Sequence, residues 1–204
     1  MCSPSGHMRR GPFLVACIRL YDGRPMATIV CGIDPGLGLT GFAVLNARTA
    51  PAQVLDAGVC RFSSKESLAS RLAAIHADIS AILDDHRPNL VAVEQLYSHY
   101  NHPRTAILMG HARGVILQAA ASRGIEVRSY SATRIKRFLT GNGRATKAQV
   151  QRAIQMTFSL PAPPDPPDVA DALAIALCAT ADPASRELQL TRRDTPSPLG
   201  RGPG

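Results

Sequence analysis

The sequence has no run of apolar residues that approaches the roughly 20 needed to span a bilayer. Its five cysteines are scattered, and no two form a C-x-x-C pair, so neither a disulfide framework nor a zinc site is indicated. No segment of the 204 residues repeats another. These absences exclude a membrane-spanning protein, a disulfide-stapled secreted domain and a repeat protein, and they fit a reducing cytoplasm.

The two ends of the chain lack the patterns of a folded domain. Residues 1–25 contain no small-residue cleavage site after their short apolar stretch, which Arg19 interrupts, so a secretory signal is not expected. We interpret them as a disordered extension, and an organelle transit peptide stays open as the alternative. Residues 183–204 are rich in proline, glycine, serine and arginine, which predicts a disordered basic tail. One folded domain is therefore expected over residues 26–182.

Acidic residues are scarce in one quarter of the chain. Between Arg104 and Arg152 there are ten lysines and arginines and one acid, Glu126, whereas the rest of the chain has 13 basic and 14 acidic residues. The whole net charge of +8 therefore comes from this stretch. Such a concentration favours a nucleic-acid partner. The alternative is a solvated basic face with no partner.

The hydrophobic pattern changes period along the chain. Short apolar runs predict strands at residues 28–33, 40–46 and 53–62, which short connections make antiparallel. Apolar residues at helical spacing then predict a helix at residues 65–86. The elements expected after it are strands at 90–93 and 126–130 and helices at 105–122, 133–139, 146–158 and 168–180.

This order predicts an α/β fold. Three antiparallel strands followed by two helix-linked parallel strands form a mixed five-stranded sheet with helices on both faces. The order resembles the ribonuclease-H-like fold, and that resemblance implies that the first strand is central and the fourth lies beside it.

Four acidic residues stand where such a sheet binds ligands. Asp34 and Glu94 end the first and fourth strands, and ligands of open α/β sheets bind outside the carboxyl ends of strands. Asp168 and Asp171 share one face of an otherwise apolar helix. Clustered carboxylates bind Mg²⁺, and two such ions about 4 Å apart can hydrolyse a phosphodiester. The four acids therefore predict a metal-dependent nuclease site.

Three of the four acids also have a simpler interpretation. Asp34 can be a turn residue before Pro35-Gly36, Glu94 a surface acid at a strand end, and Asp168 a helix N-cap. Asp171 resists such an interpretation, because a carboxylate inside an apolar helix rarely stays unpaired.

A glycine-rich loop, GNGRATK, covers residues 141–147. It lacks the spacing of a nucleotide-binding loop, but its amides and Lys147 can hold a DNA phosphate at a helix N-terminus. An ordinary surface turn is the alternative. Tyr97, shortly after Glu94, is expected to stack on an unpaired base, or else to pack under its own loop.

Five short motifs stand in a fixed order: GIDPG at 32–36, EQ at 94–95, GHARG at 110–114, GNGRATK at 141–147 and DVADALA at 168–174. Together they resemble the RuvC family of crossover junction endodeoxyribonucleases, within the ribonuclease-H-like superfamily. The resemblance implies catalytic metal binding by Asp34, Glu94, Asp168 and Asp171, and it implies that Lys147 acts at the scissile phosphate. It also implies two Mg²⁺ ions per site, with Mn²⁺ as a substitute.

The resemblance further implies a homodimer that nicks opposite strands of a four-way (Holliday) DNA junction symmetrically. A branch-migration helicase complex of the RuvA and RuvB type is then the expected partner, in the cytoplasm at the nucleoid and away from any membrane. One departure is Tyr97, where the family commonly has phenylalanine. The expected DNA contacts are Tyr97, Arg104, Arg113, Lys136, Arg137, Arg144 and Lys147.

Two other classes of protein compete with this interpretation. A sugar-kinase or actin-like ATPase shares the Asp-x-Gly motif of the first hairpin but needs a second lobe with its own phosphate motif, which this chain is too short to hold. A related nuclease that acts on RNA, or a relative that binds nucleic acid without cutting it, remains the alternative, because a fold does not determine a function.

Overall fold

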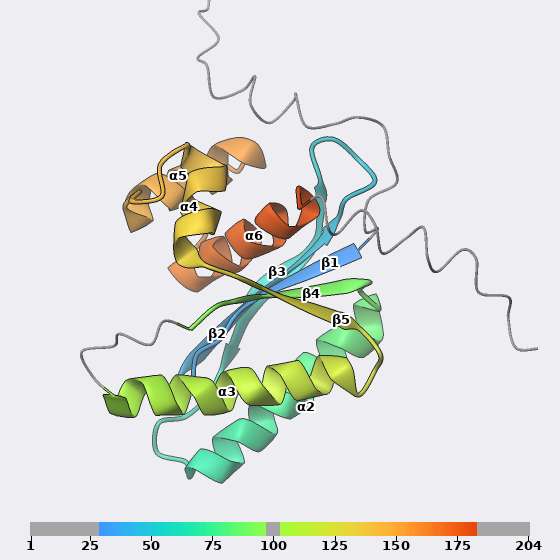
Figure 1. Ribbon diagram of the computed structural model, residues 1–204, viewed down its shortest axis with the longest axis vertical. Helices are drawn as coiled ribbons and strands as arrows, with labels where there is room; N and C mark the ends of the chain where they lie inside the picture. Colours follow the sequence, from blue (N-terminus) through green and yellow to red (C-terminus); the bar gives the residue numbers. More distant parts are fainter. Residues whose placement is uncertain (1–28, 97–102, 183–204) are drawn as a thin grey trace, which may run out of the picture.

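The computed structural model describes residues 29–96 and 103–182 (Figure 1). The expectations for residues 1–25 and 183–204 lie outside this part of the chain. None of the helices described is both long and apolar enough to cross a membrane. The elements, in chain order, are β1 (Ile29–Asp34), β2 (Leu39–Asn46), β3 (Gln53–Arg61), α2 (Leu68–His86), β4 (Leu90–Glu94), α3 (Pro103–Ala121), β5 (Glu126–Tyr130), α4 (Ala132–Thr140), α5 (Lys147–Thr157) and α6 (Pro167–Thr180).

The predicted elements are all present, and a capping residue explains one shifted boundary. The helix expected from residue 65 begins at Leu68 instead, because the Ser67 side chain accepts a hydrogen bond of 3.1 Å from the backbone N–H of Ser70. Such an N-cap satisfies one of the donors that the first turn of a helix leaves free.

The five strands form one mixed sheet in the order β3-β2-β1-β4-β5. The pairs β1–β2 and β2–β3 are antiparallel, and the pairs β1–β4 and β4–β5 are parallel. This confirms the predicted sheet, with β1 in the centre and β4 beside it.

The register brings the ends of β1 and β4 together. Ile33 pairs with Val93 in the parallel ladder, so Asp34 and Glu94, the next residue of each strand, end neighbouring strands at the same edge. Across the antiparallel ladder, Asp34 pairs with Gly41 of β2.

Helices cover both faces of the sheet (Figure 1). Cys31 and Ile33 of β1 pack in one core with α2 and α3, and Val30 of the same strand packs in the other with α4, α5 and α6. Because β1 and β4 are buried on both faces, their sequences are nearly continuous apolar runs instead of alternating ones.

Helix α6 lies directly on the backbone of β1 and β2. A Cβ atom added to Gly32 would lie 2.5 Å from the backbone oxygen of Ala172 and 2.5 Å from the backbone nitrogen of Ala176. A Cβ added to Gly41 would collide with the backbone oxygen of Asp168. Only glycine permits so close an approach. The first turn of α6 is therefore held beside Gly41, the ladder partner of Asp34.

Candidate active site

Asp34 is the half-buried last residue of β1 and precedes a tight turn. The buried Thr40 hydroxyl donates a hydrogen bond of 2.7 Å to the Gly36 oxygen, and the Arg71 guanidinium donates one of 3.1 Å to the Leu37 oxygen. These bonds close the turn, so the turn itself does not require the carboxylate of Asp34. The turn-residue interpretation therefore leaves this acid unexplained.

Glu94 ends β4, and its backbone is held from two sides. The Arg113 guanidinium of α3 donates a hydrogen bond of 3.3 Å to the Glu94 backbone oxygen and another to the Ser129 hydroxyl of β5. The next residue, Gln95, donates its N–H to the Tyr130 oxygen at 2.9 Å. Glu94 is half-buried, which a simple surface acid at a strand end would not be.

Asp168 and Asp171 come from the first turns of α6. The N-cap of this helix is Pro166, with no side-chain hydrogen bond, and Pro167 is its first residue. The N-cap interpretation of Asp168 is therefore wrong: this acid stands inside the first turn, where the helix dipole favours negative charge. Asp168 lies against Gly41, the ladder partner of Asp34. After burial and Glu94, the charges of Asp171 and Asp168 add to the rise in the pKa of Asp34, so both aspartates lie near the end of β1.

Lys147 is the first residue of α5, and a capping box fixes its position. The Thr146 hydroxyl accepts from the N–H of Gln149 at 3.3 Å, and the Gln149 side chain accepts from the N–H of Thr146 at 2.8 Å. The ammonium nitrogen Nζ of Lys147 lies 2.9 Å from Oδ2 of Asp171. The T-x-x-Q pattern is a known signal of a helix start that the sequence analysis did not use.

The four acids and Lys147 lie close enough together for their charges to interact. Burial raises the pKa of Asp34 to about 7, and Glu94, Asp171 and Asp168 add to the rise, while Lys147 opposes it. Burial and Asp171 raise the pKa of Glu94, against the opposing effect of Lys136 and Lys147. The hydrogen bond to Asp171 raises the pKa of Lys147. The acids therefore repel one another, and the lysine offsets only part of that repulsion.

The chemistry of this donor set fits a divalent cation. Carboxylate oxygens are the ligands that Mg²⁺ prefers, and a cation among the acids would relieve the repulsion that raises the pKa of Asp34. In residues 29–96 and 103–182, no three acidic, histidine or cysteine side chains are already arranged to hold a metal ion. One oxygen of Asp171 is paired with Lys147, so cation binding requires side-chain rotation, above all at Asp171.

The predicted DNA contacts differ in their surroundings. Arg104 is exposed in the first turn of α3, and Arg137 and Arg144 are exposed on α4 and in the loop before α5. Lys136 is half-buried and lowers the pKa of Glu94. Arg113 is half-buried and hydrogen-bonded within the protein. Tyr97 lies outside the described residues.

The chain matches one family of known proteins along most of its length. A family model described as "Crossover junction endodeoxyribonuclease RuvC" matches residues 30–179. A protein of that name from Rhodopirellula baltica is 50% identical over 161 residues, which cover 78% of this chain and 90% of that protein. One from Heliobacterium modesticaldum is 41% identical over 150 residues, 74% of this chain and 92% of that protein.

Solved structures of RuvC are also similar to this chain. The chain is similar to Thermus thermophilus RuvC in complex with a Holliday junction substrate, with a TM-score of 0.69 and 36% sequence identity. The similarity covers 74% of this chain and 92% of that one.

Proposed function

Because this chain belongs to the RuvC family of crossover junction endodeoxyribonucleases, we propose that it resolves four-way (Holliday) DNA junctions by cutting two opposite strands symmetrically. The observation that carries the proposal is the convergence of Asp34, Glu94, Asp168, Asp171 and Lys147 at the carboxyl ends of β1 and β4. The solved complex of a relative with a junction supports this choice of substrate.

The proposed cofactor is Mg²⁺, two ions per site, with Mn²⁺ as the expected substitute. Asp34, Glu94, Asp168 and Asp171 would hold it. Bound there, such ions supply a water nucleophile at neutral pH and neutralise the charge on the leaving oxygen. The half-buried acids contribute a site from which bulk water is partly excluded, and this strengthens every electrostatic interaction in it.

Lys147 is the proposed ligand of the scissile phosphate. Its side chain is 57% exposed, so it can leave Asp171 and donate to a phosphate oxygen that enters from solvent. If Lys147 donates to a phosphate instead of to Asp171, the Asp171 oxygen that it leaves would be free to bind a cation. Lys136 and Arg137 lie on α4 and Arg144 lies in the loop after it, and we propose that they contact the DNA backbone, with Arg104 at the start of α3.

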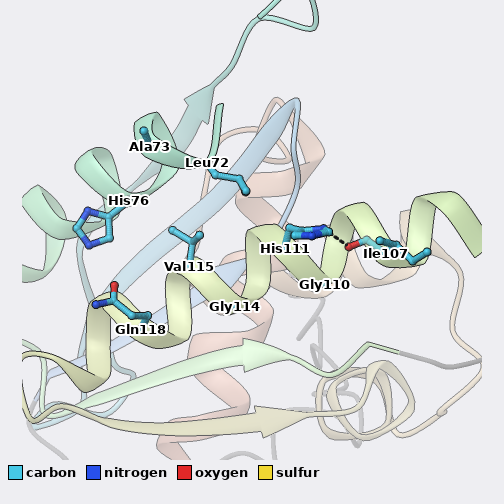
Figure 2. Close-up of a pocket in the computed structure, with 9 residues that line it drawn as sticks. All are labelled: Leu72, Ala73, His76, Ile107, Gly110, His111, Gly114, Val115 and Gln118. Atoms are coloured by element: carbon cyan, nitrogen blue, oxygen red, sulfur yellow. Dashed lines mark hydrogen bonds between the residues drawn. The ribbon is translucent and has the colours of Figure 1, made fainter. Parts of the chain in front are cut away.

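Symmetric cutting requires two copies of the site, so we propose a homodimer. A groove of about 650 Å³ lies between α2 and α3, lined by Leu72 and His76 on one side and by Gly110, Gly114 and Val115 on the other (Figure 2). A Cβ atom added to either glycine would meet no atom within 4 Å.

The exposed Ile107 extends this apolar surface, since 62% of its area is accessible. An exposed apolar surface beside a flat, glycine-lined helix suits the self-complementary packing of a twofold dimer. The proposed partner of this dimer is a branch-migration helicase complex of the RuvA and RuvB type, in the cytoplasm at the nucleoid.

The test offers the full-length protein a synthetic four-way junction, a linear duplex of matched sequence and an RNA/DNA hybrid, each with and without Mg²⁺. We expect paired, symmetric nicks in the junction alone, and only with Mg²⁺. The variant Asp34→Asn is the matched control, and it should bind the junction without cutting it. Cleavage of the hybrid in preference to the junction would support the RNA-directed alternative, and binding without any cleavage would support a non-cleaving relative.

A further inference from the structure

Two arginine side chains donate hydrogen bonds to backbone oxygens close to the two acids that end β1 and β4. Arg71, from α2, donates from both Nε and Nη2 to the Leu37 oxygen, three residues beyond Asp34. Arg113, from α3, donates from Nε to the backbone oxygen of Glu94. Both side chains are half-buried.

Arg71 completes the turn that follows β1. Leu37 is only 8% exposed, so its carbonyl oxygen has little access to water. A buried carbonyl without a donor is costly, so the turn would shift to regain a partner. Because this turn directly continues the strand that carries Asp34, a shift of the turn would move the carboxylate at its start.

Arg113 acts at the point where β4 leaves the sheet. The last ladder pair of β4 with β5 is Glu94 with Tyr130. Arg113 fixes the peptide group of Glu94, and its second hydrogen bond, to Ser129, ties the same guanidinium to β5. The planar guanidinium holds its two acceptors at fixed angles, whereas the lysine ammonium is a single nitrogen on a flexible stem.

We propose that Arg71 and Arg113 are positioning residues that hold Asp34 and Glu94 in the geometry needed for cation binding. The proposal rests on the proposed function in one respect, since it takes these two acids as cation ligands. It assigns Arg113 a role within the protein, whereas the charge pattern of the sequence assigned it to DNA. Residues that orient metal ligands in this way typically change metal affinity or activity by about 10–100-fold when they are removed.

The experiment compares Arg71→Gln and Arg113→Gln with the control Arg123→Gln. Arg123 follows α3, ten residues beyond Arg113, and its guanidinium bonds both oxygens of Asp84 on α2 at 2.7 Å. The control thus removes the same chemical group from a site beyond the end of α3, away from Glu94.

Three quantities are measured for each purified variant: Mn²⁺ binding to the DNA-free protein by electron paramagnetic resonance, junction binding without divalent metal, and single-turnover cleavage in Mg²⁺. We expect Arg71→Gln and Arg113→Gln to weaken Mn²⁺ binding by about 10-fold or more and to slow cleavage similarly. Junction binding should stay within about 3-fold of wild type, because neither arginine is taken as a phosphate ligand. Arg123→Gln should change none of the three.

A conservative variant covers the case in which a glutamine variant unfolds. Arg113→Lys keeps a charged donor for the Glu94 oxygen but loses the fixed two-point geometry of the guanidinium. Its Mn²⁺ affinity should therefore fall between those of wild type and Arg113→Gln, or below wild type if Arg113→Gln does not fold. Arg71→Lys serves in the same way at Leu37. Normal Mn²⁺ binding by these variants would overturn the proposal, and so would a loss of junction binding with normal Mn²⁺ binding. A wild-type protein that binds Mn²⁺ but cuts no junction would instead refute the proposed function.

Discussion

The ammonium nitrogen of Lys147 lies 2.9 Å from a carboxylate oxygen of Asp171, and this contact joins the first turn of α5 to the start of α6. The lysine thus pairs with one of the carboxylate oxygens that a cation would need as ligands. An ion pair with a half-exposed lysine contributes little stability in water, so it is readily exchanged for a phosphate.

The role proposed for Lys147 predicts a slower reaction when this residue is replaced. Lys147→Ala should lower the single-turnover rate of junction cleavage by about 10²–10³, because one preorganised electrostatic donor contributes about that much. Its junction affinity should fall much less. Both are measured with enzyme in excess over the junction. A variant that cuts at the normal rate once it is saturated would reduce Lys147 to an ordinary backbone contact.

The raised pKa of Asp34 predicts a stability that depends on pH. The folded protein holds this pKa at about 7, whereas an unfolded chain titrates at about 3.9. Between these two pH values Asp34 is protonated in the folded protein and ionised in the unfolded chain. The free energy of unfolding therefore falls as the pH rises from about 4 to about 7. Asp34→Asn should therefore raise the free energy of unfolding at pH 8 by about 1–4 kcal/mol, and by much less at about pH 4.5.

Denaturation in metal-free buffer with EDTA measures this difference. Asp84→Asn is the control of opposite sign, because the hydrogen bond from Arg123 lowers the pKa of Asp84, so the charged form of this acid stabilises the fold at neutral pH. An equal stabilisation by Asp34→Asn at both pH values would show that the charge of Asp34 is not its source.

The basic stretch predicts a particular dependence on salt. Junction binding should weaken steeply as salt rises, because each bound phosphate releases counterions. Replacement of Arg137 or Arg144 by glutamine should reduce the slope of log affinity against log salt by about 1 for each phosphate that the variant no longer binds. Matched replacements of Lys65 or Arg87 should leave the slope unchanged. Equal effects of the two pairs would mean that the charge asymmetry does not mark the DNA surface.

A substitution in the groove between α2 and α3 should weaken the proposed dimer without destabilising the folded monomer. A Cβ atom at Gly114 meets open space, and leucine improves helix propensity, so the Gly114→Leu monomer should keep its melting behaviour or gain about 0.5–1 kcal/mol. The dimer should dissociate at a higher protein concentration than the wild type does, because the leucine obstructs close helix packing. Sedimentation at several concentrations measures this, and an unchanged dimer would place the interface elsewhere.

Much of the fold could be predicted because strands buried on both faces and amphipathic helices differ in period. The position of β4 beside β1 was not readable from periodicity and came from the family resemblance. The site was predictable as a set of acids at element ends, yet Asp168 was open to an N-cap interpretation until Pro166 was found at that position. Arg71 was missed and Arg113 was assigned by charge alone, because a hydrogen bond to a distant backbone oxygen leaves no local pattern in the sequence.

The close approach of α6 to Gly32 and Gly41 determines how the site can respond to a change of charge. Where helix and sheet meet through side chains, the helix can slide by repacking them, but here backbone rests on backbone. The helix is therefore a stiff support, and its aspartates can adapt only by rotation of their own side chains. Binding or release of a cation should thus change the side-chain rotamers of Asp168 and Asp171. The backbone of the first turn of α6 should stay in place.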